Sequence, residues 1–364
     1  DWKAGDLKKE YRQITKPDLA LSPIPRWDSL ENQMKYYIQG AVQTTRGCPF
    51  DCEFCDVIYL FGRRTRSKPI DKVLEEVSVL ERLGMERIFF CDDNFIGNRS
   101  YTKELLRELI PLNNSFRKPI LFSTQLSIDL AQNEELLELM ADANFGTLYI
   151  GIESPNKESL KETNKLQNVR SDLIEDCKKI MSYGMVIRAA MIVGFDNDDT
   201  SIFDQHFEFT QKSHIPLAST ALLNAFTGTR LWRRLLAEGR LLSRSEAYKE
   251  GQTRLGRTNI IPKRMTRVEL LSGYLDLLKR NHDWDNFAAR VKEMASNVKR
   301  KPNVPQKSEP EEGLSSAAVN TFLFSLDEKA RNAIISIFLH TRQHAPFMME
   351  KVLGITLQQY SKSK

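Results

Sequence analysis

Cysteine and histidine are scarce in this 364-residue sequence, and it has no long apolar run. The five cysteines are too few and too crowded for a disulfide framework, so we expect a reducing, cytoplasmic environment. The longest apolar stretches, such as AAMIVGF at 189–195, fall far short of the ~20 residues that cross a bilayer, so no transmembrane segment is expected. No charged segment followed by an apolar run opens the chain, so we expect no signal peptide.

An excess of one charge is also nearly absent. The net charge of +5 on 42.0 kDa does not by itself indicate nucleic acid, and we expect no DNA partner. Hydrophobic residues make up 41% of the chain, which is typical of a globular protein, and the length predicts about two domains. The chain begins at Asp1 rather than methionine, so we expect a fragment or a processed chain.

Short apolar segments alternate with amphipathic segments over 37–225. We expect strands at 37–45, 87–93, 119–125, 147–153, 186–195 and 217–224, and helices at 71–83, 100–110, 133–142, 170–183 and 200–213. The helical segments repeat apolar residues every three or four positions, as in Val73, Val77 and Leu80. This alternation predicts an α/β fold with a parallel sheet, and six units favour a partial (βα)6 TIM-type barrel. A doubly wound sheet is the alternative.

The segments on either side of this region differ from it in composition. Residues 1–36 are polar and contain three prolines, which predicts an N-terminal arm or linker. We expect 226–364 to be a mainly α-helical C-terminal region, with helical segments over 264–299 and 314–353. The charged, proline-containing stretch at 299–313 predicts a linker between them.

Three of the five cysteines stand close together in RGCPFDCEFCDV, at 46–57. Cys48, Cys52 and Cys55 have the spacing C-x3-C-x2-C and follow the first expected strand, at the edge where barrel active sites lie. A tetrahedral zinc site usually takes four protein ligands, whereas no histidine precedes His206. Three thiolates would instead leave one corner of a four-iron cluster open to a cofactor. A zinc site completed by a distant ligand, or structural thiols, are the alternatives.

This motif, with Phe54 before its last cysteine, resembles the radical S-adenosylmethionine (SAM) superfamily over roughly 37–225. The resemblance implies that the three cysteines bind a [4Fe–4S] cluster, whose fourth iron is chelated by the methionyl amine and carboxylate of SAM. Reductive cleavage of SAM would then give a 5′-deoxyadenosyl radical that abstracts hydrogen from a substrate. An electron donor such as flavodoxin or ferredoxin is implied as a partner.

The resemblance also assigns cofactor contacts at the ends of the other strands. FFCDDNF at 89–95 stands where relatives hold the methionyl amine, so Asp92 and Asp93 are candidate ligands. Their alternative role is to cap the next helix. Gln125 and Glu153 end the third and fourth strands and would face the ribose and the methionine moiety.

Further positions are assigned in the same way. Gly151 would let the backbone approach the cofactor, while Lys165 and Arg188 compete for the methionyl carboxylate. IVGF at 192–195 resembles a glycine-containing segment that contacts the adenine. The basic run LFGRRTRS at 60–67 would bind an acidic group or form a solvated loop.

Several segments narrow the resemblance to the cobalamin-binding branch of the superfamily: TTRGCPFDCEFCDV, DDNFIGN, FSTQLSIDLA and NAFTGTRLW. Members of this branch with a helical C-terminal extension include hopanoid and bacteriochlorophyll methylases. After Cys55 only Cys91 and Cys177 remain, which disfavours a second cluster. The branch motif D-x-H-x-x-G is incomplete at Asp204–His206, so we expect His206 to be structural and cobalamin to bind outside this chain.

We therefore expect a radical SAM enzyme, a cobalamin-dependent C-methylase of a hydrophobic small-molecule or lipid-like substrate. One alternative is a cobalamin-independent radical SAM enzyme that modifies tRNA or a small molecule. Another is a zinc- or iron-stabilised binding module without turnover. No motif identifies the residue that completes the reaction on the substrate.

Overall fold

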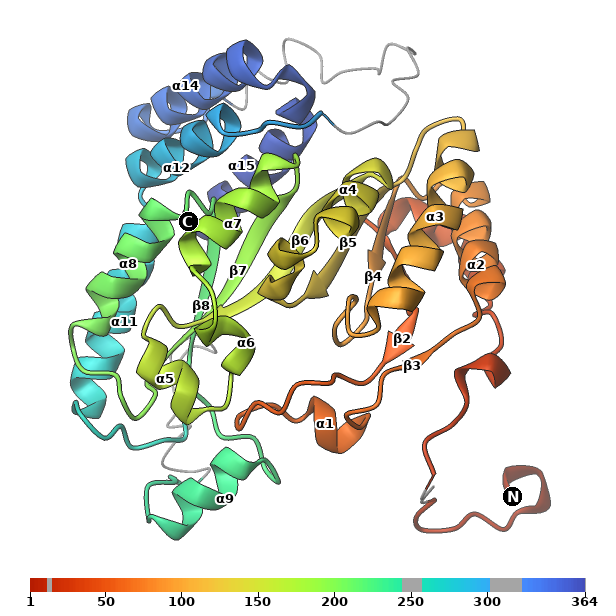
Figure 1. Ribbon diagram of the computed structural model, residues 1–364, viewed down its shortest axis with the longest axis horizontal. Coiled ribbons are helices and arrows are strands. Elements are labelled where there is room, and N and C mark those ends of the chain that lie inside the picture. The colour runs from red at the N-terminus through yellow and green to blue at the C-terminus, as the bar shows by residue number, and fades with distance from the viewer. Residues whose placement is uncertain (12–14, 244–256, 302–322, 364) are drawn as a thin grey trace.

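The computed structural model describes residues 1–11, 15–243, 257–301 and 323–363, and Figure 1 shows the course of the chain. Its centre is a parallel sheet of β1 (Gly40–Val42), β4 (Arg87–Phe90), β5 (Leu121–Leu126), β6 (Phe145–Glu153), β7 (Val186–Val193) and β8 (Leu217–Leu222). The strands lie in the order β1-β4-β5-β6-β7-β8, so neighbours follow the chain without a reversal. The partial barrel is confirmed, because a doubly wound sheet reverses its strand order.

Helices connect the strands and cover one face of the sheet (Figure 1). They are α2 (Ile70–Arg82), α3 (Arg99–Ser115), α4 (Glu134–Asp142), α7 (Leu173–Ser182) and α8 (Ile202–Lys212), with a 3-10 segment η4 (Ile128–Gln132) before α4. Every strand and helix predicted over 37–225 is present, although their ends differ by a few residues. The short helices α1 (Val57–Leu60), α5 (Lys157–Glu162) and α6 (Leu166–Val169) were not predicted.

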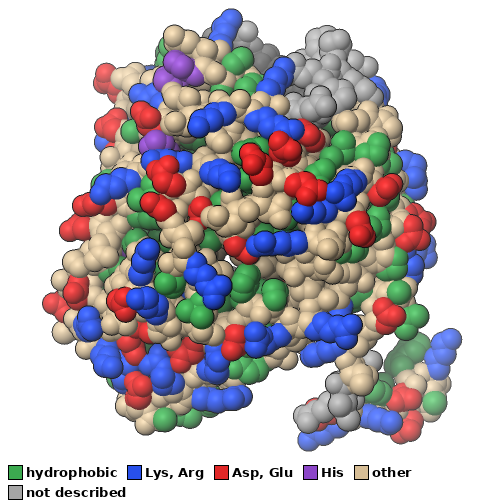
Figure 2. Space-filling view, in the orientation of Figure 1, with side chains coloured by type: hydrophobic (Ala, Val, Ile, Leu, Met, Phe, Trp, Pro, Cys, Tyr) green, Lys and Arg blue, Asp and Glu red, His purple; other side chains and the backbone are tan. Residues whose placement is uncertain are grey.

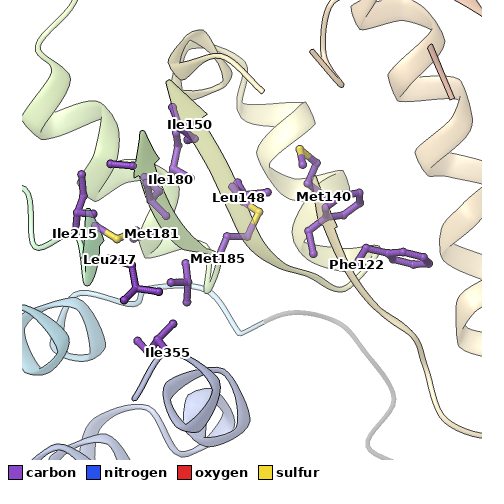
Figure 3. Packing of buried hydrophobic residues seen from close by; sticks show 14 of the residues in the cluster. Phe122, Met140, Leu148, Ile150, Ile180, Met181, Met185, Ile215, Leu217 and Ile355 are labelled. Atoms are coloured by element: carbon purple, nitrogen blue, oxygen red, sulfur yellow. The ribbon is translucent and has the colours of Figure 1, made fainter. Parts of the chain in front are cut away.

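The two faces of the sheet differ in burial. In β6 the side chains of Leu148 and Ile150 are fully buried, whereas the alternating Tyr149 and Gly151 are partly exposed. Figure 3 shows Leu148 and Ile150 in the core beside Ile180, which comes from α7. Burying one such aliphatic side chain stabilises the fold by about 1.5–3 kcal/mol. One face therefore holds the helices, and the other is left open to line a site.

The described part of the C-terminal region is mainly helical, as predicted. It contains α9 (Arg230–Ala237), α11 (Arg267–Asn281), α12 (Trp284–Ser296), α14 (Glu328–His344), η6 (Pro346–Met348) and α15 (Met349–Ser363). The helix predicted over 264–299 is two helices, and Asp283 begins the second by accepting from the backbone N–H groups of Asp285 and Asn286. Most of the predicted linker at 299–313, and the first residues of the segment that follows it, lie outside the described residues.

Helices α12, α14 and α15 pack at the amino ends of the strands, at the opposite end of the sheet from α1 and α9 (Figure 1). Ile355 of α15 belongs to the same buried cluster as Met185 and Leu217, which lie close to it in Figure 3. Lys351 donates from Nζ to the backbone oxygen of Gly184, 2.7 Å away, just before β7. The last helix is thus anchored to the barrel by both apolar and polar contacts.

The N-terminal arm contains three 3-10 segments, η1 (Trp2–Ala4), η2 (Leu19–Leu21) and η3 (Trp27–Tyr36). Most of its side chains are exposed, but Met34 is buried in the main core. Lys72 of α2 donates from Nζ to the backbone oxygen of Ala20 at 2.6 Å. No helix among the described residues has the length and apolar character needed to cross a membrane.

Candidate active site

The three cysteines of the motif lie on one loop at the carboxyl edge of the sheet. Two short antiparallel strands that the sequence did not reveal, β2 (Thr45–Arg46) and β3 (Arg66–Ser67), pair at the base of this loop and close it. Gly47 has a φ of +102°, and a Cβ there would lie 2.8 Å from the backbone oxygen of Arg64. Glycine is therefore required at the point where the chain turns toward Cys48.

A tight turn joins the last two cysteines, because the Cys55 N–H donates to the Cys52 carbonyl at 3.3 Å. Cys52 is 7% exposed, Cys48 and Cys55 are half-buried, and all three are free thiols. Burial raises the pKa of Cys48 and raises the pKa of Cys55 to about 11. Hydrogen bonds from the backbone N–H of Phe50 to Cys48, and from that of Val57 to Cys55, partly offset this rise. Thiols in such surroundings ionise readily only when a metal supplies positive charge.

These residues fit an iron–sulfur cluster better than a single metal ion. No group of three or more His, Cys, Asp or Glu side chains within the described ranges is arranged to hold one metal ion. A four-iron cluster makes a different demand, because each thiolate binds its own iron and hydrogen bonds to the sulfurs tune the cluster. Hydrogen bonds to the Cys48 sulfur from Phe50 and the Asn94 side chain, and to Cys55 from Val57, meet that demand.

A buried ion pair lies beside the cysteines. Lys165 Nζ is 2.8 Å from Glu153 Oε1, and the two side chains are 11% and 8% exposed. Burial alone lowers the pKa of Lys165, but the Glu153 carboxylate and the sulfurs of Cys52 and Cys55 raise it by more, so the pKa lies above its usual value. Lys165 therefore stays charged and places a cation next to the thiols.

Gly151 makes room for this ion pair. A Cβ at Gly151 would lie 2.4 Å from Glu153 Oε1, closer than such contacts allow, and 3.0 Å from Lys165 Nζ, which is a tight contact. Asn168 fixes the same segment by donating from Nδ2 to the backbone oxygens of Gly151 and Ile152, each at 2.9 Å. In the structure this glycine serves the Glu153–Lys165 pair, a role that its position at a strand end did not reveal.

Asp92 has a structural role instead of the predicted ligand role. Its side chain is fully buried, and its Oδ1 accepts from the Thr44 N–H at 2.7 Å. Its Oδ2 accepts from the hydroxyl groups of Thr44 and Thr45, the latter at 2.8 Å. Burial raises the pKa of Asp92, while these hydrogen bonds act against the rise. Both carboxylate oxygens are thus occupied in holding the chain ahead of the cysteines, which corrects the sequence-based assignment.

Asp93 and Gln125 remain at the carboxyl edge with more accessible side chains. Asp93 is half-buried and accepts from the Gly47 N–H at 2.7 Å, so it touches the cysteine loop directly. Gln125 is exposed, and its Nε2 donates to the Asp92 backbone oxygen at 2.6 Å. The capping alternative for the two aspartates is wrong, because Asn98 caps α3 through the Tyr101 N–H.

Arg188 does not lie at this edge. It stands five residues before the end of β7, and its partners in register are Tyr149 and Leu217. Its Nη1 donates to Gln358 Oε1 of α15, 3.1 Å away, at the amino end of the sheet. The assignment of Arg188 to the methionyl carboxylate is therefore wrong, because only Lys165 of the two candidates lies beside the cysteines.

The segment at 192–195 is tied to the cysteine loop by an aromatic contact. Gly194 has a φ of +109°, and the N–H groups of Gly194 and Phe195 donate to Asp198 Oδ2 at 2.9 and 3.0 Å. The Phe195 ring then meets the Phe54 ring, with centroids 5.9 Å apart. The buried carboxylate of Asp198 thus fixes a turn that packs against the motif.

The basic run at 60–67 is mostly occupied by the protein itself. Arg63 donates to the Pro49 carbonyl at 3.1 Å, and Arg66 donates to the Pro17 carbonyl at 2.6 Å. Figure 2 shows lysine and arginine interspersed with aspartate and glutamate over the face in view, not gathered into one patch. These arginines therefore support the loop and the arm.

Helix α9 contributes two arginines that sequence reasoning missed. Arg230 Nη1 lies 2.9 Å from Asp51 Oδ2, and Arg234 binds both carboxylate oxygens of Glu53 at 2.8 and 3.0 Å. Arg234 also reaches Asp196 Oδ2 after β7, at 2.6 Å. Asp51 and Glu53 flank the central cysteine, so α9 clamps the cysteine loop onto the barrel. One feature of the sequence could have revealed this clamp. Two arginines stand four residues apart on α9, and two acidic residues that could pair with them flank the central cysteine of the motif.

His206 is buried within α8, and neither ring nitrogen has a hydrogen-bond partner in the described part of the chain. Burial lowers its pKa to about 3. Its surroundings are those of a core side chain, as expected from the incomplete cobalamin motif.

Residues 42–210 match the radical SAM superfamily, and residues 229–361 match a domain of unknown function, DUF4070. The chain is 42% identical over 261 residues to an uncharacterized methyltransferase of Synechocystis, covering 71% of this chain and 48% of that protein. It is 34% identical over 243 residues to the hopanoid C-2 methylase of Rhodopseudomonas palustris, covering 65% of this chain and 46% of that protein. The chain thus spans about half the length of these curated relatives.

Solved structures agree with the fold. The radical SAM methyltransferase TsrM of Kitasatospora setae, with cobalamin and a [4Fe–4S] cluster bound, has a TM-score of 0.54 at 14% identity over 90% of this chain and 62% of its own. The cobalamin-dependent radical SAM enzyme OxsB has a TM-score of 0.54 at 12% identity, covering 94% of this chain and 60% of its own. At such identities the likeness shows the fold alone. Together with the sequence match over 42–210 and the cysteine loop at the sheet edge, it leads to one conclusion: residues 42–210 of this chain form a radical SAM domain.

Proposed function

We propose that this chain is the radical SAM and C-terminal part of a cobalamin-dependent methyltransferase that acts on carbon in a hydrophobic small molecule. The observation that carries the proposal is the cysteine loop, which holds three free thiols at the carboxyl edge of the sheet beside a buried lysine. The methyltransferase relative at 42% identity supports the reaction class. A [4Fe–4S] cluster with SAM bound supplies one-electron cleavage of SAM.

Each residue at this edge has a defined task in the proposal. Cys48, Cys52 and Cys55 hold the cluster, and the loop contacts described above keep them in place. The Glu153–Lys165 pair offers one negative and one positive group, which matches the ammonium and carboxylate of the methionyl part of SAM. Asp93 is a second carboxylate on the same edge. In this proposal Gln125, which is exposed at the end of β5, binds the ribose hydroxyls.

The remaining features of the proposal concern the whole protein. Residues 37–225 form the radical SAM unit and 226–364 the C-terminal unit. Cobalamin binds to a segment outside this chain, in line with the match to this chain spanning only 48% and 46% of the two relatives. The reductant is a small electron-transfer protein such as flavodoxin or ferredoxin, and the enzyme works in the cytoplasm.

Anaerobic reconstitution with iron and sulfide tests the radical SAM function. We expect a brown protein whose visible absorption is bleached by dithionite and which then releases 5′-deoxyadenosine from SAM. Cys52→Ala should abolish both signals. Cys177→Ala is a matched control, because that cysteine is buried in α7, outside the motif, and should leave both intact. A colourless protein that binds one zinc ion and releases no 5′-deoxyadenosine would refute the proposal.

The methyl transfer is tested separately in the full-length protein. SAM carrying a deuterated methyl group should yield a deuterated product only when cobalamin is present. Turnover of SAM that is indifferent to cobalamin would contradict the methyltransferase part and favour a cobalamin-independent radical enzyme.

A further inference from the structure

A second polar cluster lies on the open face of the sheet, at the end opposite the cysteines. It consists of Arg188 on β7, Ser219 on β8, and Gln358 and Lys362 on α15. Arg188 Nε and Lys362 Nζ both donate to Ser219 Oγ, at 3.4 and 3.3 Å, and Arg188 Nη1 donates to Gln358 Oε1 at 3.1 Å. Two cations from distant parts of the sequence therefore share one hydroxyl group.

The positive charge of this cluster is unbalanced. Neither Arg188 nor Lys362 forms an ion pair with a carboxylate anywhere in the described ranges, and both are half-buried. Burial, and then the charge of Arg188, lower the pKa of Lys362 to about 8. The Arg188 guanidinium lies over the Tyr149 ring, 5.4 Å from its centroid. Two like charges withdrawn from water destabilise each other unless an anion joins them.

We propose that Arg188 and Lys362 bind the anionic end, a carboxylate or phosphate, of an amphiphilic small molecule that lies along the open face. Arg188 retains guanidinium N–H groups beyond its bonds to Ser219 and Gln358, and a guanidinium can bind the planar end of a carboxylate or a phosphate through parallel N–H bonds. Lys362 adds a compact ammonium charge on the same side of the ligand.

The inference rests on the proposed function, because the amphiphile is taken to be the substrate. Between the cluster and the cysteine edge, the open face presents the small residues Gly151, Ala190 and Ala221, of which the two alanines are exposed, and then the partly exposed Ile192. Five residue steps separate Arg188 from the end of β7, roughly 17 Å at about 3.3 Å per residue. A ligand anchored at Arg188 would need that length to reach the cysteine edge with its reacting carbon.

Equilibrium binding of three probes to the cluster-loaded protein tests the proposal: dodecyl phosphate, dodecanol and inorganic phosphate. We expect dodecyl phosphate to bind at least tenfold more tightly than inorganic phosphate, because its alkyl chain also contacts the open face. Arg188→Gln and Lys362→Gln should each weaken dodecyl phosphate tenfold or more and leave dodecanol unchanged. Lys212→Gln removes the same charge from the exposed surface of α8 and should change nothing.

Each other outcome overturns the proposal. Equal losses for dodecyl phosphate and dodecanol would mean that the variants damage packing. Equal affinities for dodecyl phosphate and inorganic phosphate would mean that the site binds free anions and does not contact the alkyl chain of the probe. Arg188→Lys should recover part of the binding if charge is the cause, and thermal unfolding of each variant checks its folding. Because binding needs no SAM cleavage, a protein that binds as expected but releases no 5′-deoxyadenosine would refute only the proposed function.

Discussion

Arg234 is the residue outside the cysteine motif whose loss we expect to damage the cysteine loop most. It binds both oxygens of Glu53 and one oxygen of Asp196, and these two carboxylate side chains are only 12% and 13% exposed. Asp196 keeps a second partner in Arg240, at 2.6 Å. Glu53 forms no other ion pair in the described part of the chain, so Arg234→Ala would leave its carboxylate poorly solvated and unpaired.

The size of the effect follows from burial. Removing one partner of a fully buried ion pair costs about 3–5 kcal/mol, whereas an exposed pair contributes at most ~1 kcal/mol. Arg234 is 31% exposed while its two partners are much less so. We therefore expect Arg234→Ala to lower the free energy of unfolding by about 2–3 kcal/mol, between these limits.

Two measurements check this prediction. Urea unfolding gives the stability change, and the rate of iron loss to a chelator reports on the loop that holds the cysteines. Arg233→Ala is the matched control, because Arg233 is the exposed neighbour on the same helix. Its guanidinium lies 5.7 Å from the centroid of the Tyr59 ring, so its loss should cost at most ~1 kcal/mol. Equal iron loss and equal stability in the two variants would refute the clamp.

Two further predictions concern buried groups. Gly151→Ala should displace the Glu153–Lys165 pair and lower the free energy of unfolding by about 1–3 kcal/mol, since its Cβ would lie 2.4 Å from Glu153 Oε1. In a double-mutant cycle measured by urea unfolding, Lys165→Ala should reduce that cost, because Glu153 can then move away. Strictly additive effects of the two mutations would contradict the clash. His206 has its folded-state pKa lowered to about 3, so the unfolded chain alone takes up a proton as the pH falls through 6.5. Relative to His206→Leu, the wild type should therefore lose about 2 kcal/mol of stability between roughly pH 8 and pH 5, and parallel pH profiles would rule this out.

The barrel could be predicted because its signals are local. Apolar periodicity in α2 and the strand-helix alternation need only neighbouring residues, and the cysteine spacing lies within one loop. Asp92 was assigned wrongly for a different reason. Its partners, Thr44 and Thr45, lie 48 and 47 residues away in sequence, and only the folded chain shows that they occupy both carboxylate oxygens.

Arg188 and the α9 clamp show the same limit more strongly. The predicted strand over 186–195 already puts Arg188 near its amino end, but the sequence does not reveal its contact with Gln358, 170 residues later. The clamp joins Arg234 to Glu53 across 181 residues. Charge complementarity was visible for the clamp, but several acidic and basic residues could have paired, and the choice among them is made by packing.

The C-terminal region reaches both ends of the barrel, and this bears on where substrate selection resides. Helix α9 holds the loop at the carboxyl edge, while α15 brings Gln358 and Lys362 to the opposite end. Between them the open face is mainly apolar, with Gly151, Ala190 and Ala221 beside Tyr149 and Ile192, and such a surface cannot discriminate strongly among ligands. Because a hydrophobic surface distinguishes related molecules by only about 1–3 kcal/mol per methylene, sharper selection requires polar contacts. In this chain the polar cluster on the open face, away from the cysteines, involves α15, so exchanging that helix between relatives should alter substrate choice more than exchanging a barrel strand.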